Sequence, residues 1–131
     1  MSSAEVVISG AGPVGLVVAL MCARVGIKVK LLEVNPEVIQ THRAMGYGPA
    51  GVIELERLGI AQECRELGMQ YPDDYVVNVR WITLDNKKIA GFKVTTPGYP
   101  PVTCGQHLVA GVILDRLAKH SNAEVLRTGW H

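Results

Sequence analysis

The sequence predicts an α/β fold with a parallel β-sheet and a β-hairpin insertion, and three observations support this prediction. A short, continuously apolar strand at residues 5–9 runs directly into a glycine-rich turn and a helix. A second strand at 28–34 follows after a short connection, and a crossover of this kind joins parallel strands in a right-handed sense. Residues 75–95 alternate in places between apolar and polar side chains about a turn, as a hairpin does.

The first segment, residues 5–34, is expected to form one strand–helix–strand unit. Residues 6–8 are three consecutive β-branched residues, which favours a buried strand. Residues 14–25 are apolar on nearly every side and rich in helix formers, and Gly26 has the position of a glycine that ends a helix. Glu33 comes at the end of the second strand.

The rest of the chain mixes loops, helices and strands. Residues 35–70 predict a loop followed by two short helices, the first of which begins near Pro49, a residue suited to a first helical turn. The hairpin at 75–95 follows, and the proline-rich stretch 96–101 is expected to be an extended loop. The last segment, 105–128, predicts an amphipathic helix and a short strand.

Composition excludes several classes of function. The chain has 131 residues, of which 48% are hydrophobic and 19% charged, so one globular domain is expected. The net charge is +1 and the charges are mixed along the chain, so neither a nucleic-acid surface nor a membrane-binding patch is predicted. No apolar run is long enough to span a bilayer, and the N-terminus lacks the basic region of a secretory signal.

The cysteines argue for a reducing environment. Cys22, Cys64 and Cys104 are odd in number and far apart, and neither they nor the histidines have the spacing of metal ligands. Neither a disulfide framework nor a metal site is therefore predicted. A cytoplasmic location is expected.

The strongest functional signal is the run G-A-G-P-V-G at residues 10–15, which lies between the first strand and the first helix. In a dinucleotide-binding motif of this spacing, the first glycine allows a tight turn and the second lets the backbone approach a pyrophosphate. The third glycine allows close packing of the helix on the sheet. Amides at the helix N-terminus then hold the phosphates.

A carboxylate at the expected distance strengthens this interpretation. Glu33 lies 18 residues after Gly15, where it can accept hydrogen bonds from both ribose hydroxyls of an adenosine and would repel a 2′-phosphate. The glycine run also follows a predicted strand and opens a predicted helix. This context favours a Rossmann-like dinucleotide site over a glycine-rich turn in some other α/β domain.

Beyond this motif, the sequence resembles the FAD-dependent aromatic hydroxylases, which are class A flavoprotein monooxygenases of the para-hydroxybenzoate and phenol hydroxylase type. The resemblance begins with the glycine run and the segment L-L-E at 31–33. It continues with R-A at 43–44 and residues 46–60, and it ends with Q-H-L at 106–108 and V-L-R at 125–127. It covers nearly the whole chain, and the hairpin is its least specific part.

The resemblance implies a set of FAD contacts. Glu33 would bind the adenosine ribose, Arg43 would lie near the pyrophosphate and ribityl chain, and Gln106 would reach the ribityl or flavin end. The pyrophosphate would be lined by five residues of the glycine run, which are Gly10, Gly12, Pro13, Val14 and Gly15. The resemblance also implies NAD(P)H as electron donor and a small aromatic or polyketide-like substrate. No catalytic residue is assigned, because the cofactor carries the hard chemistry.

The resemblance also implies a strand order and an incomplete domain. Strand 123–127 would lie beside 28–34, with 6–9 beyond it. Met45 departs from the family, because phenol-type members carry an acidic residue there that acts as a base. Family members usually run to several hundred residues. Residues 1–131 are therefore expected to be the N-terminal part of an FAD-binding domain, without the substrate domain.

Two alternatives remain open on the sequence alone. The chain could be an NAD-dependent dehydrogenase domain, although Pro13 and the arginine and glutamine segments argue against this. It could also be a non-catalytic truncated relative that acts as a binding or assembly partner. Because an outer strand edge and the hairpin would lack sheet partners, the chain is expected to self-associate or to need the missing C-terminal half as partner.

Overall fold

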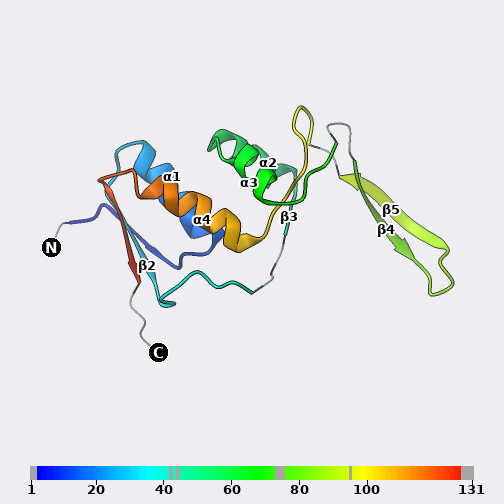
Figure 1. Cartoon of the computed structure of the whole chain (residues 1–131), viewed down its shortest axis with the longest axis horizontal. Coiled ribbons are helices and arrows are strands. Elements are labelled where there is room, and N and C mark those ends of the chain that lie inside the picture. The colour runs from blue at the N-terminus through cyan, green and yellow to red at the C-terminus, as the bar shows by residue number, and fades with distance from the viewer. Residues whose placement is uncertain (1–2, 42, 44, 73–75, 95, 128–131) are drawn as a thin grey trace. The chain divides into compact units, whose positions relative to one another are not determined.

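The computed structural model divides the chain into two compact units (Figure 1). The first unit comprises residues 1–44 and 105–131, and the second comprises residues 45–104. The structure describes residues 3–41, 43, 45–72, 76–94 and 96–127.

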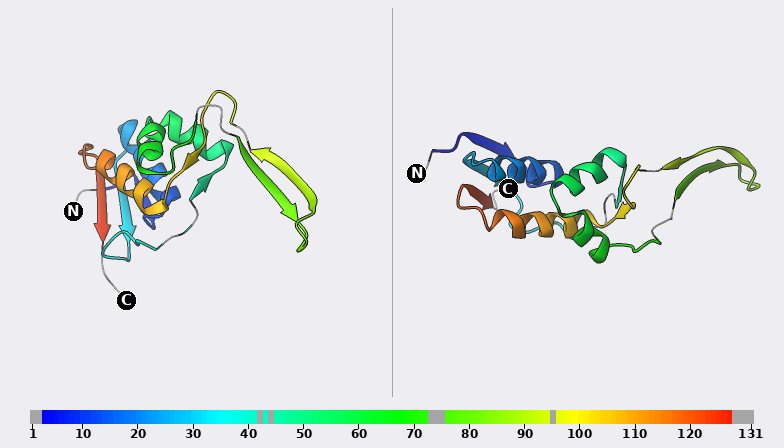
Figure 2. Two further views of the ribbon diagram at one scale, coloured as in Figure 1. Left: turned by 45° about the vertical axis from the view of Figure 1, so that its right-hand side comes forward. Right: turned by 90° about the horizontal axis from the view of Figure 1, so that it is seen from above.

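The first unit is built on a three-stranded parallel sheet. Its strands β1 (Val6–Ser9), β2 (Val29–Glu33) and β7 (Ala123–Arg127) lie in the order β1-β2-β7, and Figure 2 shows β2 and β7 running in the same direction. The register pairs Glu33 with Arg127, so the side chains of both residues lie at the carboxyl edge of the sheet. The predicted α/β fold class and the predicted strand order are confirmed.

Two helices cover one face of this sheet. Helix α1 (Pro13–Arg24) packs on the strands, and α4 (Gln106–Leu117) packs beside α1 (Figures 1 and 2). Side chains alternate along the strands between this covered face and an exposed face. The buried core of the unit is apolar and consists of Leu16, Ala19, Leu20, Ala23, Val29, Leu31, Val109, Ala110, Val112, Ile113 and Leu117.

The two apolar helices α1 and α4 are short, with 12 residues each. Within the part of the chain that the structure describes, no helix combines the length and the apolar character that a membrane crossing requires. Gly26 follows α1 with a φ of +83°, which confirms the predicted helix end. The side chain of Asn122 then ties β7 to this helix end, because its Nδ2 donates to the carbonyls of Ala23 and Ile27 at 3.0 and 2.9 Å.

The second unit contains two short helices and two small antiparallel sheets. Helix α2 (Pro49–Arg57) begins at Pro49 as predicted, and α3 (Ala61–Leu67) follows it. Strands β3 (Gly46–Tyr47) and β6 (Val102–Thr103) pair with each other; the sequence predicts a loop at 46–47 and assigns no helix or strand to 102–103. Two-residue strands have no periodicity to read, and their pairing depends on residues far apart in the chain.

Within the second unit, an arginine near the C-terminal end of α3 links α2 to the loop before β6. Arg65 pairs with Glu56 at 2.5 Å and donates to the carbonyl of Pro100 at 3.0 Å. Gly68 ends α3 where a Cβ would collide with the carbonyl oxygen of Thr103, so α3 and β6 approach closely at this point.

The predicted hairpin is present. Strands β4 (Val77–Ile82) and β5 (Lys88–Val94) pair antiparallel with a register shift at Trp81 (Figure 1). The turn is held by Thr83 and by Asn86, whose φ of +64° is the left-handed conformation that asparagine tolerates. The end residues of the predicted range, Tyr75 and Thr95, lie outside the described residues.

Candidate functional site

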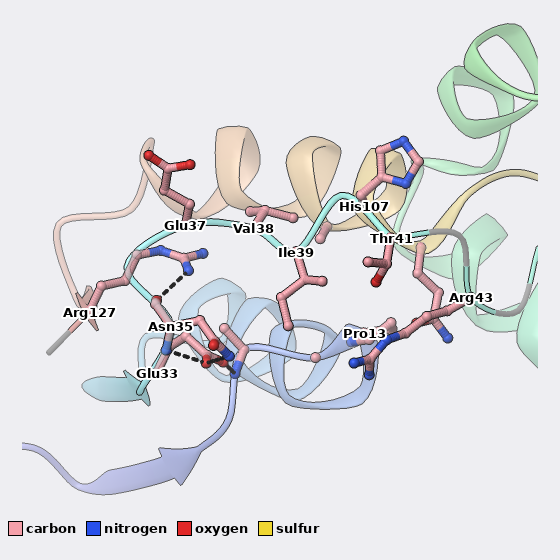
Figure 3. Close-up of a pocket in the computed structure, with 14 residues that line it drawn as sticks. Pro13, Glu33, Asn35, Glu37, Val38, Ile39, Thr41, Arg43, His107 and Arg127 are labelled. Atoms are coloured by element: carbon pink, nitrogen blue, oxygen red, sulfur yellow. Dashed lines mark hydrogen bonds between the residues drawn. The ribbon is translucent and has the colours of Figure 1, made fainter. Parts of the chain in front are cut away.

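A groove in the first unit lies where β1 and β2 end and where α1 and α4 begin. Figure 3 shows Glu37 and Arg127 toward one end of this groove and Pro13, Arg43 and His107 toward the other. Its lining comes from four separate stretches of the chain and consists of Ala11, Gly12, Pro13, Glu33, Asn35, Glu37, Val38, Ile39, Thr41, Arg43, Gln106, His107, Ala110 and Arg127. This is the carboxyl edge of a parallel sheet, where open α/β folds bind their ligands.

The glycine run gives the groove its floor. Gly10 has a φ of +98°, a conformation that residues with a side chain rarely adopt, and its N–H donates to the carbonyl of Leu32 at 2.7 Å. A Cβ on Gly15 would collide with the carbonyl oxygen of Gly10, so α1 can start this close to β1 only with glycine there. A Cβ on Gly12 would meet no protein atom within 4 Å, so the space beside it is open for a ligand.

Glu33 is held by the backbone around it. Its Oε2 accepts a hydrogen bond from the N–H of Ala11 at 2.6 Å. Its Oε1 accepts from both the backbone N–H and the side-chain Nδ2 of Asn35, at 2.8 and 2.7 Å. These hydrogen bonds, first those of Asn35 and then that of Ala11, lower the pKa of the Glu33 carboxyl, and the positive charge of Arg127 adds to the effect. The groove therefore contains an oriented, ionised carboxylate.

Two helix N-termini meet this groove. Helix α1 starts at Gly12 and Pro13, and α4 starts at Gly105 and Gln106. Neither helix has an acidic residue in its first turn, so no carboxylate from that turn offsets the positive end of its dipole. Backbone amides at such ends, together with the Arg43 guanidinium, suit an anionic group such as a phosphate.

The structure brings five of the predicted site residues together in the groove: Gly12, Pro13, Glu33, Arg43 and Gln106. The other three, Gly10, Val14 and Gly15, are not part of its lining, and Val14 is 78% exposed. Gly10 and Gly15 instead shape the turn below it. Ala44, part of the predicted arginine segment, lies outside the described residues.

Sequence reasoning missed the residues that join the groove from loops and from β7. Asn35 and Arg127 are the clearest examples, because Nη1 of Arg127 donates to the carbonyl oxygen of Asn35 at 3.1 Å (Figure 3). An arginine that ends a strand beside the acidic one, in a predicted parallel sheet, is a signal that could have been used. His107 was also missed, although it follows Gln106 directly and lines the same groove.

These features fit the dinucleotide FAD that the sequence resemblance implies. The open space beside Gly12 admits a pyrophosphate close to the backbone, and the oriented Glu33 carboxylate offers acceptors for ribose hydroxyls. The residues that would hold the adenosine and pyrophosphate all belong to the first unit.

Relatives of known function support this assignment. The chain is 32% identical over 129 residues to para-nitrophenol 4-monooxygenase of Pseudomonas sp. strain WBC-3, with 92% of this chain and 30% of the relative covered. It is 31% identical over 121 residues to 6-methylpretetramide 4-monooxygenase of Streptomyces rimosus, with 88% and 27% covered. The chain thus spans about 30% of the length of such relatives.

Solved structures agree with the fold. The crystal structure of p-nitrophenol 4-monooxygenase PnpA from Pseudomonas putida DLL-E4 matches with a TM-score of 0.77 and 29% identity, covering 97% of this chain and 32% of that one. A model of the FAD binding domain family matches residues 3–128. The chain therefore belongs to the FAD binding domain family.

Proposed function

We propose that the chain is the FAD-binding portion of an NAD(P)H-dependent flavin monooxygenase that hydroxylates an aromatic or polyketide-like substrate. The observation that carries this proposal is the groove of the first unit, where Gly12, the Glu33 carboxylate and the start of α1 share one surface. Two relatives that cover most of the chain are monooxygenases by name, one acting on para-nitrophenol and one on 6-methylpretetramide.

Each part of the groove has a proposed role. Glu33 binds the ribose of the adenosine, and Arg43 neutralises the charge of the pyrophosphate. The pyrophosphate lies against the helix start formed by Gly10, Gly12, Pro13, Val14 and Gly15. Gln106, in the first turn of α4, contacts the ribityl chain or the flavin end. The geometry supports these roles through the lining shared by Gly12, Pro13, Glu33, Arg43 and Gln106 and through the hydrogen bonds of Glu33.

In the proposed reaction, FAD and the residues of this chain have different roles. When bound, FAD supplies the redox chemistry by which electrons from NAD(P)H reach O2 and a substrate is hydroxylated. The residues of this chain bind and orient the cofactor through its adenosine and pyrophosphate. They hold no proton donor or acceptor that we assign to the reaction. In particular, Met45 offers no ionisable group where phenol-type enzymes carry a base.

We further propose that the substrate is contacted by residues corresponding to the part of the relatives that this chain does not cover. The exposed face of the first sheet supports a covering partner, because Val7, Leu32 and Leu126 lie there and Val7 is 61% exposed. Parallel sheets are usually covered on both faces. Either the remaining part of such an enzyme or a second copy of this chain covers it. Light scattering tests this: self-association would favour a second copy, and a monodisperse monomer that melts cooperatively would contradict both.

The cellular location is part of the same proposal. We propose a reducing, cytoplasmic compartment because the three cysteines are odd in number and far apart in the sequence, so no disulfide framework is expected.

The proposal is tested by titrating the 131-residue chain with FAD in a calorimeter and by flavin fluorescence. Gly12→Val is the matched variant, since its side chain enters open space and leaves the fold intact while filling the groove. Saturable binding of FAD that Gly12→Val abolishes is the expected result, and NAD+ should not displace the flavin. A folded chain that binds no FAD, or a Gly12→Val variant that binds as well as the parent chain, would contradict the proposal.

A further inference from the structure

Glu33, an acidic residue of the groove, is supported by a chain of contacts that links the ends of β2 and β7. Asn35 donates twice to Oε1 of Glu33, once from its backbone N–H and once from Nδ2. The carbonyl oxygen of the same Asn35 accepts a hydrogen bond from Nη1 of Arg127 at 3.1 Å. Asn35 therefore stands between the strand end of β2 and the strand end of β7.

This arrangement follows from the register of the sheet. Glu33 and Arg127 are paired positions of β2 and β7, so their side chains leave the sheet at the same edge and on the same face. The chain turns immediately after Glu33, which places Asn35 over that edge. The guanidinium of Arg127 reaches the outside of this turn, and Figure 3 shows it directed toward Asn35.

The contacts constrain both oxygens of the Glu33 carboxylate. Ala11 binds Oε2 and Asn35 binds Oε1, so rotation of the carboxylate about its last bond would break hydrogen bonds on both oxygens. Hydrogen bonds to an ionised acceptor are about twice as strong as those between neutral groups. A ribose that approaches Glu33 thus meets an acceptor whose orientation is already set, and the entropy of ordering it is not lost on binding.

We propose that Asn35 and Arg127 are positioning residues that fix Glu33 for recognition of the adenosine ribose, Arg127 acting through the carbonyl of Asn35. The inference rests on the proposed function, because it deepens the role of Glu33 within the same nucleotide site. Asn35 holds the carboxylate directly. Arg127 holds the turn that carries Asn35.

The test uses the full chain and two probes, ADP and 2′,3′-dideoxy-ADP, whose affinities are compared by calorimetry. The ratio of the two affinities isolates the ribose hydroxyls from the pyrophosphate. Because a hydrogen bond to a charged group contributes about 1.5–3 kcal/mol, the parent chain should prefer ADP by on the order of tenfold or more. In Asn35→Ala and Arg127→Leu this preference should fall several-fold, and Arg127→Lys should restore part of it.

A matched control and a ligand-free readout complete the design. Lys30→Ala removes another charged residue of β2, whose side chain pairs with Glu124 on the opposite face, so it should leave the preference unchanged. Without ligand, NMR titration of the Glu33 carboxyl should show a higher midpoint in Asn35→Ala than in the parent chain. The other titratable and charged groups that line the groove (Glu37, Arg43, His107 and Arg127) are the same in both proteins.

The outcomes are distinguishable. If the parent chain binds neither probe, the proposed nucleotide site is contradicted, and the ligand-free titration alone decides whether Asn35 positions Glu33. If the parent chain prefers ADP while Asn35→Ala and Arg127→Leu keep the same preference, the positioning role is overturned and the nucleotide site stands. An unchanged Glu33 midpoint in Asn35→Ala would also overturn it.

Discussion

Gly15 faces the carbonyl oxygen of Gly10 so closely that a Cβ built on Gly15 collides with that oxygen. The same Cβ would lie 3.3 Å from Cγ2 of Ile8, a residue of β1. The last glycine of the run is therefore a packing requirement between α1 and the end of β1. The open glycine of the groove, Gly12, has a different role, because nothing in the protein occupies the space beside it.

The first prediction concerns this contact. Gly15→Ala forces the start of α1 away from β1 and should lower the free energy of unfolding by roughly 1–3 kcal/mol, the usual range for overpacking. Gly111→Ala is the control, because Gly111 lies inside α4 with no atom within 4 Å of its Cβ position, and this variant should be neutral or slightly stabilising. Urea denaturation followed by circular dichroism measures both. Equal stability of the two variants would count against the contact.

A second prediction concerns Asn122, whose amide bridges the end of α1 and the start of β2. Asn122→Ala leaves the carbonyls of Ala23 and Ile27 without their shared donor and should destabilise the fold by about 1–3 kcal/mol. Asn78→Ala serves as comparison, because the Nδ2 of Asn78 makes one exposed hydrogen bond within the hairpin. Thermal melting of the two variants should differ by several degrees, and identical melting temperatures would exclude the bridging role.

A third prediction follows from the lowered pKa of Glu33. Since the hydrogen bonds from Asn35 and Ala11 hold the pKa below the ordinary value of 4.5, the ionised carboxylate contributes stability above that pH. This contribution is lost as the pH falls through the pKa of the folded state. Glu33→Gln should be less stable than the parent chain near neutral pH, and the difference should shrink under acid. A stability difference that is constant between neutral and acidic pH would show that Glu33 has an ordinary pKa.

A fourth prediction concerns the thiols of the second unit. Burial raises the pKa of Cys64 to about 12 and also raises the pKa of Cys104, so neither is a reactive thiolate near neutral pH. Iodoacetamide should modify both only after denaturation, while the half-buried Cys22 of the first unit reacts faster. Mass spectrometry of the labelled peptides measures the three rates. Rapid labelling of Cys64 in the native chain would mean that the core around it opens.

The sequence predicts the first unit well because its signals are local. The β-branched run of β1, the glycines before α1 and Gly26 after it each act on their own neighbours, so the strand–helix–strand segment can be predicted directly. The final strand, Ala123–Arg127, is confirmed with the predicted bounds. The hairpin is also local, because its turn lies between two alternating strands.

The features that the sequence does not reveal depend on distant pairs. Gly46–Tyr47 and Val102–Thr103 become strands only because they meet each other. Asn35 and Arg127 are separated by 92 positions, and their hydrogen bond requires the register of β2 with β7. Glu33 and Gly12 could be predicted as site residues from the motif, whereas their surroundings could not. Whether these residues bind FAD stays a prediction.

The most direct measurement of the nucleotide site is an NMR titration of the isotopically labelled 131-residue chain with ADP. The predicted result is a saturable shift of the backbone amides of Ala11, Gly12 and Asn35, while the amides of the hairpin strands β4 and β5 stay in place. The same titration of Gly12→Val should leave the groove amides unshifted. Shifts spread evenly over both units, or none in a folded chain, would contradict a dinucleotide site at this edge of the sheet.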